Sequence, residues 1–307
     1  MRLVFAGTPE AAVPALDALA ASAHEVCAVV SRPDSAAGRG RRSRRSAVAA
    51  RADELGIPVW TPDAPGDPQF VDRLRSLRPE CCPVVAYGAL LPPDVLGIPA
   101  HGWVNLHFSL LPAWRGAAPV QHALLHGDPV TGATVFRIDA GLDTGPILAM
   151  REEPVSPTDT SGTLLGRLSR IGADLLVDTL DGLAEGTLTA IAQPEHGATY
   201  APKIVPADAR VRWAESAESV DRLVRACTPT PGAWTTFRGE RVGLGPVRLL
   251  DGAIGVPGEL SAGKAEVVVG TGTAAVALGD VRPPGRREMP AADWARGVRP
   301  EPGEAFA

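Results

Sequence analysis

The sequence lacks the marks of several common classes of protein. Its four cysteines show no C-x-x-C spacing, and no His, Cys or Asp cluster has the spacing of metal ligands, so we expect reduced thiols in a cytosolic protein and no metal site. No segment approaches the length of a membrane span, and the first apolar run is too short for a signal peptide. Neither G-x-G-x-x-G nor a P-loop follows Gly7-Thr8-Pro9, which argues against a dinucleotide or ATP site.

Lysine is scarce as well. Lys203 and Lys264 are the only lysines among 30 basic residues, so arginine supplies nearly all of the positive charge. The net charge of −5 gives no sign of a polyanionic partner for the molecule as a whole. Residues 206–307 hold thirteen basic and thirteen acidic side chains, so the first 205 residues carry the whole −5. Within that acidic part lies one basic segment, residues 31–46, with six arginines and one aspartate.

In the first part of the chain, short apolar runs alternate with segments of helical period. The expected strands are residues 2–6, 25–30, 57–60, 82–87, 102–107, 134–138 and 147–150. The expected helices begin at Pro9, cover residues 47–55, 70–77 and 120–126, and end with a long helix that opens at Thr160 or Ser161. This rhythm predicts an α/β fold with a doubly wound, mostly parallel, Rossmann-like sheet, whose ligand site lies outside the carboxyl ends of the strands.

The pattern changes near residue 206. Residues 194–206 are typical of a linker, and short strands with Gly and Pro turns follow at 210–213, 233–237, 241–250, 266–270 and 274–278, around a helix at 219–227. The sequence therefore predicts two domains, 1–205 and 206–307, with linker residues from about 190 to 205 closing the first. The second is expected to be a small β-barrel.

Three polar residues, Asn105, His107 and Asp143, stand where a site is expected. Asn105 and His107 end the strand 102–107 and point to the same face, because strand side chains alternate. Asp143 lies in a G-L-D-T-G loop after another strand, and neighbouring parallel strands end at one edge of a sheet, so we expect it within reach of His107. A carboxylate stabilises a charged imidazole, and an Asn amide can donate to a developing oxyanion.

Taken singly, each of these residues has an ordinary structural explanation. A strand-end His is often a satisfied structural group, an Asn often ends a ladder, and an Asp in such a loop often makes a turn. The hypothesis of a catalytic site therefore depends on their joint placement. Ser109 lacks a G-x-S-x-G elbow, so we interpret it as a binding or capping residue rather than a nucleophile.

Longer motifs point to a family. N-L-H-F-S-L-L-P-A-W-R-G-A-A-P-V-Q begins at Asn105, and T-G-A-T-V-F-R-I-D-A-G-L-D-T-G-P-I-L begins at Thr131. With the opening F-A-G-T-P-E, R-P-D-S-A-A-G-R-G at 32–40, V-V-A-Y-G at 84–88 and Y-A-P-K-I at 200–204, the chain resembles the folate-dependent formyltransferases over nearly its whole length, most closely those that act on methionyl-tRNA. One departure is Phe108, where glycine is common in the family.

The resemblance implies roles for particular residues. Asn105, His107 and Asp143 match the family's catalytic positions. The segments that contact tetrahydrofolate match Ser109, Leu110, Leu111 and Pro112, together with Val84, Val85, Ala86, Tyr87 and Gly88. A loop that grips the acceptor stem of tRNA matches the basic segment, with its arginines Arg32, Arg39, Arg41, Arg42, Arg44 and Arg45, and the family's second domain is an OB-like barrel that binds tRNA.

The resemblance also implies a reaction: transfer of the formyl group of 10-formyltetrahydrofolate, a co-substrate, to the α-amine of initiator methionyl-tRNA. On this hypothesis Asn105 and a protonated His107 stabilise the oxyanion, and Asp143 keeps His107 charged and helps to remove the amine proton. We expect a cytoplasmic monomer that needs no metal and no membrane. The alternatives are formyl transfer to a small amine, hydrolysis of the folate, and a degenerate RNA- or folate-binding module.

Overall fold

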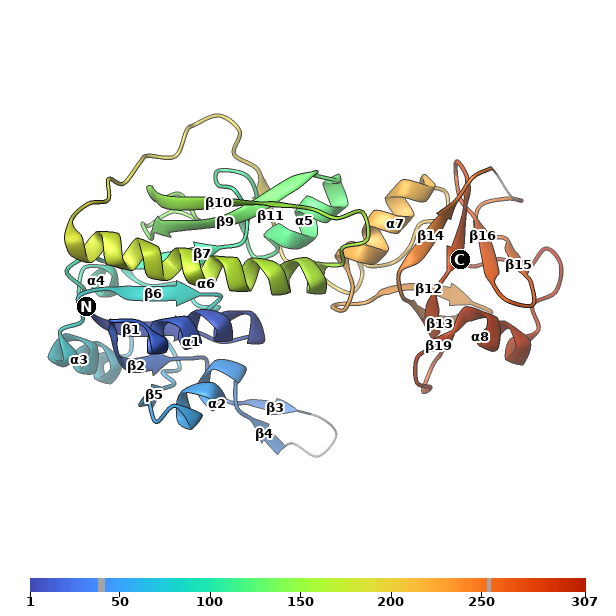
Figure 1. The fold of residues 1–307 in the computed structure, drawn as a ribbon. Helices are drawn as coiled ribbons and strands as arrows, with labels where there is room; N and C mark the ends of the chain where they lie inside the picture. The colour runs from blue at the N-terminus through green and yellow to red at the C-terminus, as the bar shows by residue number, and fades with distance from the viewer. Residues whose placement is uncertain (38–41, 253–254) are drawn as a thin grey trace. The chain divides into compact units, whose positions relative to one another are not determined.

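A computed structural model describes residues 1–37, 42–252 and 255–307 (Figure 1). The chain divides into two compact units, and neither is one continuous stretch. The first comprises residues 1–116, 130–154 and 165–200, and the second comprises 117–129, 155–164 and 201–307. In the described part of the chain, no helix combines the length and the apolar character needed to cross a bilayer.

A seven-stranded sheet forms the centre of the first unit (Figure 1). Its order is β10 (Ile147–Pro154), β9 (Val130–Arg137), β7 (Trp103–His107), β6 (Cys82–Val85), β1 (Arg2–Gly7), β2 (Glu25–Val30) and β5 (Val59–Trp60). The strands from β7 to β5 are parallel, whereas β9 and β10 join antiparallel at one side. The predicted mostly parallel α/β sheet is confirmed.

Helices cover both faces of this sheet. The first unit holds η1 (Glu10–Ala12), α1 (Val13–Ala21), α2 (Ala47–Glu54), α3 (Pro68–Leu77), α4 (Pro93–Leu96) and most of α6 (Ser161–Glu185). The Ser46 hydroxyl caps α2 by accepting a hydrogen bond from the Ala49 N–H. α3 and α4 pack on the face that includes Trp103, and α6 packs on the opposite face, where Gly172 admits the Leu106 side chain. A Cβ at Gly172 would lie 3.0 Å from Leu106.

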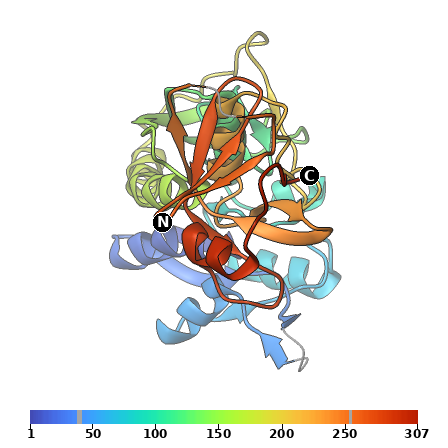
Figure 2. The same ribbon diagram turned by 90° about the vertical axis from the view of Figure 1, so that its right-hand side faces the viewer.

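The second unit contains two antiparallel four-stranded sheets around one core (Figure 2). One sheet is β12 (Ala233–Phe237), β13 (Glu240–Leu244), β18 (Asp280–Arg282) and β19 (Met289–Pro290); the other is β14 (Val247–Leu250), β17 (Ala275–Leu278), β16 (Val267–Gly270) and β15 (Leu260–Ala262). The unit's helices are α5 (Pro119–His126), α7 (Ala217–Ala226) and α8 (Ala291–Val298). Trp213 and Trp294 both stack on Phe306 at its centre, and Phe237 meets Trp294 edge to face with ring centroids 5.2 Å apart. The small antiparallel β-domain expected from the sequence is confirmed.

Three details of the sequence prediction are wrong. Residues 210–213 make only one bridge, from Arg210 to Trp234, before the chain turns toward α7. Residues 241–250 are two strands in different sheets, because Pro246 has no N–H to continue a ladder. The arms of the basic segment, which was expected to be a loop, pair as a hairpin of β3 (Ser35–Ala37) and β4 (Arg42–Arg44).

Candidate active site

His107 ends β7 and is 6% exposed. Its Nε2 lies 2.8 Å from the carbonyl oxygen of Trp114, so Nε2 carries the proton and donates it to that carbonyl. Trp114 presents its carbonyl from a left-handed backbone conformation, with φ +60°. In the neutral ring, Nδ1 therefore holds a free lone pair.

The protonation of His107 differs from the sequence-based expectation. Burial lowers the pKa of His107 below its ordinary value, and the opposing effects of Asp143 and the Trp114 carbonyl are smaller. The ring is therefore neutral at neutral pH in the free protein. The charged His107 expected from the sequence belongs to the reaction, whereas the free protein favours the neutral ring, because removal from water outweighs the nearby carboxylate.

Asp143 faces the free Nδ1 of His107. Its Oδ2 lies 3.8 Å from that nitrogen and accepts a hydrogen bond from the Gly116 N–H at 2.8 Å. The expected proximity is confirmed, but the argument from parallel strands is wrong. β9 runs antiparallel to β7, with Arg137 opposite Val104, so the β9–β10 loop must fold back toward His107. Asp143 takes a left-handed φ of +53° in that loop.

Asn105 lies on the same face of β7 as His107, two positions earlier. Its side chain is half-buried. Among the described residues its amide has no hydrogen-bond partner. An unpaired amide beside a neutral imidazole leaves an N–H donor for a ligand oxygen.

The turn of residues 109–112 follows directly after β7 and Phe108. Ser109 is fully buried; its hydroxyl donates to the Ala113 carbonyl at 2.6 Å, and its own carbonyl accepts from the Thr134 hydroxyl at 2.6 Å. The Leu111 N–H donates to the same Thr134 oxygen at 3.2 Å. Ser109 thus caps the turn, whereas Leu110 and Pro112 stay half-buried.

The segment 84–88 lies beside this turn, because Val84 of β6 pairs with Asn105 of β7. Val84, Val85 and Tyr87 are buried, while Ala86 and Gly88 are exposed. Ala86 and Gly88 both take positive φ values, of +47° and +82°, which turn the chain sharply at the end of β6. Burial raises the pKa of Tyr87, and the nearby Arg32 opposes that effect.

The predicted arginines fall into three groups. Arg32 donates to the Asp63 carbonyl at 3.3 Å, and Arg45 makes a two-pronged ion pair with Asp53, so both already have protein partners. Arg42 and Arg44 lie on β4, where Arg44 is exposed. Arg39 and Arg41 lie outside the described residues.

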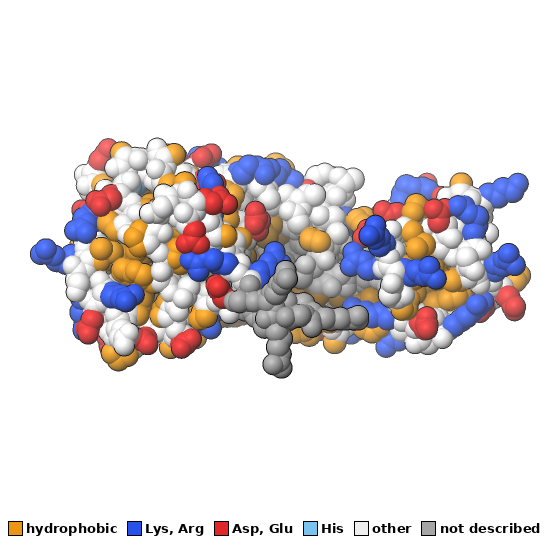
Figure 3. Space-filling view, turned by 90° about the horizontal axis from the view of Figure 1, so that it is seen from below, with side chains coloured by type: hydrophobic (Ala, Val, Ile, Leu, Met, Phe, Trp, Pro, Cys, Tyr) orange, Lys and Arg blue, Asp and Glu red, His pale blue; other side chains and the backbone are white. Residues whose placement is uncertain are grey.

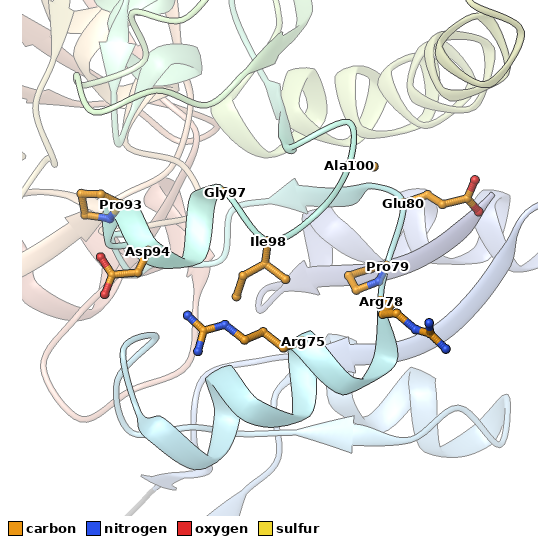
Figure 4. Close-up of a pocket in the computed structure, with 9 residues that line it drawn as sticks. All are labelled: Arg75, Arg78, Pro79, Glu80, Pro93, Asp94, Gly97, Ile98 and Ala100. Carbon is orange, nitrogen blue, oxygen red and sulfur yellow. The ribbon is translucent and has the colours of Figure 1, made fainter.

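One cavity of the first unit lies away from the cluster formed by Asn105, His107 and Asp143 (Figure 4). It is lined by residues that precede β6 and β7, among them Arg75, Arg78, Glu80, Asp94 and Ile98, and it contains none of the predicted site residues. These residues are at the amino end of the parallel strands, whereas His107 is at the carboxyl end of β7.

Sequence reasoning missed two residues that contact the cluster. Gln193 donates from its Nε2 to the carbonyls of Asp143 and Gly145, both at 2.8 Å. The Thr199 hydroxyl accepts the Trp114 N–H at 2.8 Å. Both residues belong to the segment interpreted as the end of the first domain and the linker, where neither periodicity nor motif marks a polar side chain as important.

Known proteins match this chain over its whole length. Residues 1–180 match the formyl transferase family, and residues 203–299 match the formyl transferase C-terminal domain. A methionyl-tRNA formyltransferase of Nocardioides sp. is 62% identical over 306 residues, covering 99% of this chain and 97% of that protein.

Solved structures share the fold at lower identity. HypX from Aquifex aeolicus aligns with a TM-score of 0.69 at 19% identity; the alignment covers 99% of this chain, which spans about half (48%) of that protein. The N-formyltransferase from Helicobacter canadensis, solved with folinic acid and dTDP-3-aminofucose, aligns with a TM-score of 0.67 at 17% identity and covers 90% of this chain and 97% of that one.

Proposed function

Because the chain belongs to the formyl transferase family, we propose that it transfers the formyl group of 10-formyltetrahydrofolate to the α-amine of methionyl-tRNA, the initiator tRNA of protein synthesis. The observation that carries this proposal is the 62% identity over 99% of the chain. Relatives that are this similar over both domains share their substrates more often than proteins that share only a fold. The arrangement of Asn105, His107 and Asp143 supports it.

The chemistry follows from the three side chains. Bound 10-formyltetrahydrofolate supplies the carbonyl carbon that the amine attacks. The free Nδ1 of neutral His107 accepts the amine proton, and the resulting imidazolium lies between the Trp114 carbonyl and the Asp143 carboxylate, both of which stabilise its charge. The unpaired Asn105 amide donates to the oxygen on which negative charge develops. When that oxygen re-forms the carbonyl, the bond between the formyl carbon and N10 of the folate breaks, and the His107 imidazolium returns its proton to N10, so that tetrahydrofolate leaves and neutral His107 is restored.

The folate is proposed to lie against the segments 84–88 and 109–112, which flank Asn105 on neighbouring strand ends. Two exposed apolar side chains fit a flat heterocycle there: Leu90, 88% exposed, follows the first segment, and Leu142, 52% exposed, precedes Asp143. The turn at Ala86 and Gly88 leaves backbone groups for the polar edge of the ring. Ser109 contributes by fixing the turn rather than by direct contact, since its hydroxyl is buried and bonded.

The tRNA is proposed to contact both units. The basic segment, residues 31–46, supplies arginines that pair with phosphates of the acceptor stem. On the second unit, Trp234 has the Arg210 and Arg241 guanidiniums over its ring, with centroid distances of 5.7 and 4.4 Å. An aromatic ring with two cations suits a nucleotide. Figure 3 shows further Lys and Arg side chains on one face of this unit, although residues 206–307 hold equal numbers of basic and acidic side chains.

We place this activity in the cytoplasm, where charged tRNA and folate occur together, and propose that the protein acts as a monomer. One assay tests the function. The purified protein is incubated with 10-formyltetrahydrofolate and, separately, charged initiator tRNA, a small amine such as an amino sugar nucleotide or glycinamide ribonucleotide, or buffer alone. Formylation of the tRNA supports the proposal. Transfer only to the small amine, or release of formate in buffer alone, identifies the small-amine enzyme or the hydrolase instead.

A further inference from the structure

Gln193 makes four hydrogen bonds that join three parts of the first unit. Its Nε2 donates to the carbonyls of Asp143 and Gly145, both at 2.8 Å. Its Oε1 accepts from two nitrogens of Arg115, at 3.1 and 2.6 Å. The amide therefore uses both donors and both acceptor directions, which is the full capacity of a glutamine side chain.

These bonds close a ring around Asp143. The Gly116 N–H bonds the Asp143 carboxylate, and the side chain of the adjacent Arg115 bonds Gln193, whose amide in turn bonds the main chain of Asp143 itself. Asp143 is thus fixed at both ends, its carboxylate by Gly116 and its backbone by Gln193. The other side-chain bonds within the described loop run from Gly141 and Thr144 to Asp139, so without Gln193 Asp143 itself would be held at its carboxylate alone.

The backbone at Asp143 needs such an anchor. Asp143 takes a φ of +53°, which L-residues rarely adopt, and a Cβ at Gly145 would meet the Arg137 carbonyl oxygen at 1.8 Å. The loop is therefore tightly turned and packed against β9. It also has to carry Asp143 back from the far end of β9 to His107. Nothing in the strand pairing alone dictates that return.

The segment that contains Gln193, residues 193–199, also anchors Trp114, the other neighbour of His107. The Thr199 hydroxyl accepts the Trp114 N–H at 2.8 Å, and the Thr199 carbonyl accepts the Arg115 N–H at 2.9 Å. Trp114 is the residue whose carbonyl accepts from Nε2 of His107. Residues 193–199 thus hold the groups that face both nitrogens of the imidazole.

We propose that Gln193 is a positioning residue for formyl transfer: it holds the Asp143 loop so that the carboxylate faces Nδ1 of His107. This inference rests on the proposed function for its reaction, but the geometry is that of the free protein. Gln193 touches neither His107 nor a substrate group, so it acts through Asp143. It should therefore affect the rate of the chemical step rather than the affinity for either substrate.

The sharpest variant is Gln193→Glu. A glutamate has the same shape and keeps an acceptor for Arg115, but it replaces the Nε2 donors with an oxygen that repels the carbonyls of Asp143 and Gly145. We expect kcat for methionyl-tRNA to fall about ten- to hundredfold, because small misplacements of reacting groups have effects of this size. The KM values for folate and tRNA should stay within about twofold. Gln193→Ala should lose at least as much, and Glu195→Gln, at an exposed position of the same segment, should match the parent.

Hydrogen exchange gives a readout that does not depend on activity. The Gly116 amide, bonded to Asp143 Oδ2, should exchange faster in Gln193→Glu, while amides in β1 and β6 keep the parent's protection. Unchanged Gly116 exchange or unchanged kcat in Gln193→Glu overturns the positioning role. A parent enzyme without formyl transfer overturns the proposed function instead, and the Gly116 exchange then still decides whether Gln193 holds the loop.

Discussion

At His107, burial and a carboxylate act on one imidazole in opposite directions. Burial disfavours the charged form and lowers the pKa, whereas Asp143, 3.8 Å from Nδ1, favours it and offsets only part of the effect. A buried, neutral imidazole with one nitrogen bonded and the other free is suited to accept a proton. The amine of an aminoacyl ester must lose a proton when it forms an amide, so this state fits the proposed reaction.

The protonation of His107 predicts a pH dependence. Because the neutral ring is the active base, kcat/KM should fall as the pH drops through the pKa of His107, with a midpoint below the ordinary value of 6.5. Asp143→Asn removes the charge that raises this pKa, so the midpoint of its kcat/KM profile should lie at still lower pH. The maximal kcat/KM of this variant should also be lower than that of the parent. Initial rates measured across the acid range test this. Activity that is instead lost as the pH rises through neutrality would show that charged His107 is the active form.

Asn105 offers the second test at this scale. Asn105→Asp keeps the shape of the side chain but removes the N–H donor, so kcat should fall about a hundred- to a thousandfold, the usual loss for one oxyanion donor. Because the side chain is half-buried and has no described protein partner, the thermal unfolding midpoint should change little. Steady-state kinetics and calorimetry measure the two effects. A variant that keeps its rate would leave the amide without a role in the reaction.

At the scale of elements, the proposed function depends on the connections more than on the sheet. The β9–β10 loop carries Asp143, the turn after β7 carries the Trp114 carbonyl, and β4 of the hairpin carries Arg42 and Arg44. The sheet provides a rigid edge from which these connections project. Substrate preference should therefore be separable from catalysis by changing one connection at a time.

The basic segment, residues 31–46, provides the test of that separation. Replacing Arg39, Arg41 and Arg42 together with alanine should raise KM for methionyl-tRNA and lower the slope of its salt dependence by about one log unit per lost phosphate contact. The folate KM should stay the same. A matched control removes the same charge from α3 and its C-terminal cap with Arg73→Ala, Arg75→Ala and Arg78→Ala, where no tRNA contact is proposed. Equal effects of the two triple variants would mean that net charge, and not the hairpin, attracts the RNA.

At the scale of the whole molecule, the two units interleave along the chain. α5 and residues 155–164 belong to the second unit although they lie between strands and helices of the first in sequence. The two compact units therefore differ from the two domains, 1–205 and 206–307, that the sequence predicts. That division of the sequence remains a proposal. Within the second unit, Arg225 donates to the Asp159 carbonyl at 3.1 Å and Ser161 donates to the Thr228 carbonyl at 2.7 Å.

This interleaving predicts the result of a truncation. A chain that ends at residue 205 lacks α7, so α5 and residues 155–164 lose their partners, and its urea midpoint should be lower than that of the full chain. Folate binding should persist at low urea, since the proposed folate segments lie in the first unit. Adding residues 206–307 as a separate chain should restore part of the lost stability. An unchanged midpoint would show instead that the two sequence domains fold independently at 205/206.

The sequence by itself determined the parts that depend on local pattern. Apolar runs alternating with helical period predict the parallel sheet, and strand alternation places Asn105 and His107 on one face at its carboxyl edge. The motifs added the family and, with it, the reaction. These features depend on residues close together in the chain, so they can be read without knowing what packs against them.

Only the tertiary structure decided how the site is completed. The antiparallel addition of β9 sends the chain away from His107, and the return of Asp143 depends on Gly116 and on Gln193, fifty positions later in the sequence. The lowered pKa of His107 likewise follows from burial by many neighbours rather than from any one residue. Such contacts join segments that are distant in sequence, and no periodicity or spacing within one segment encodes them.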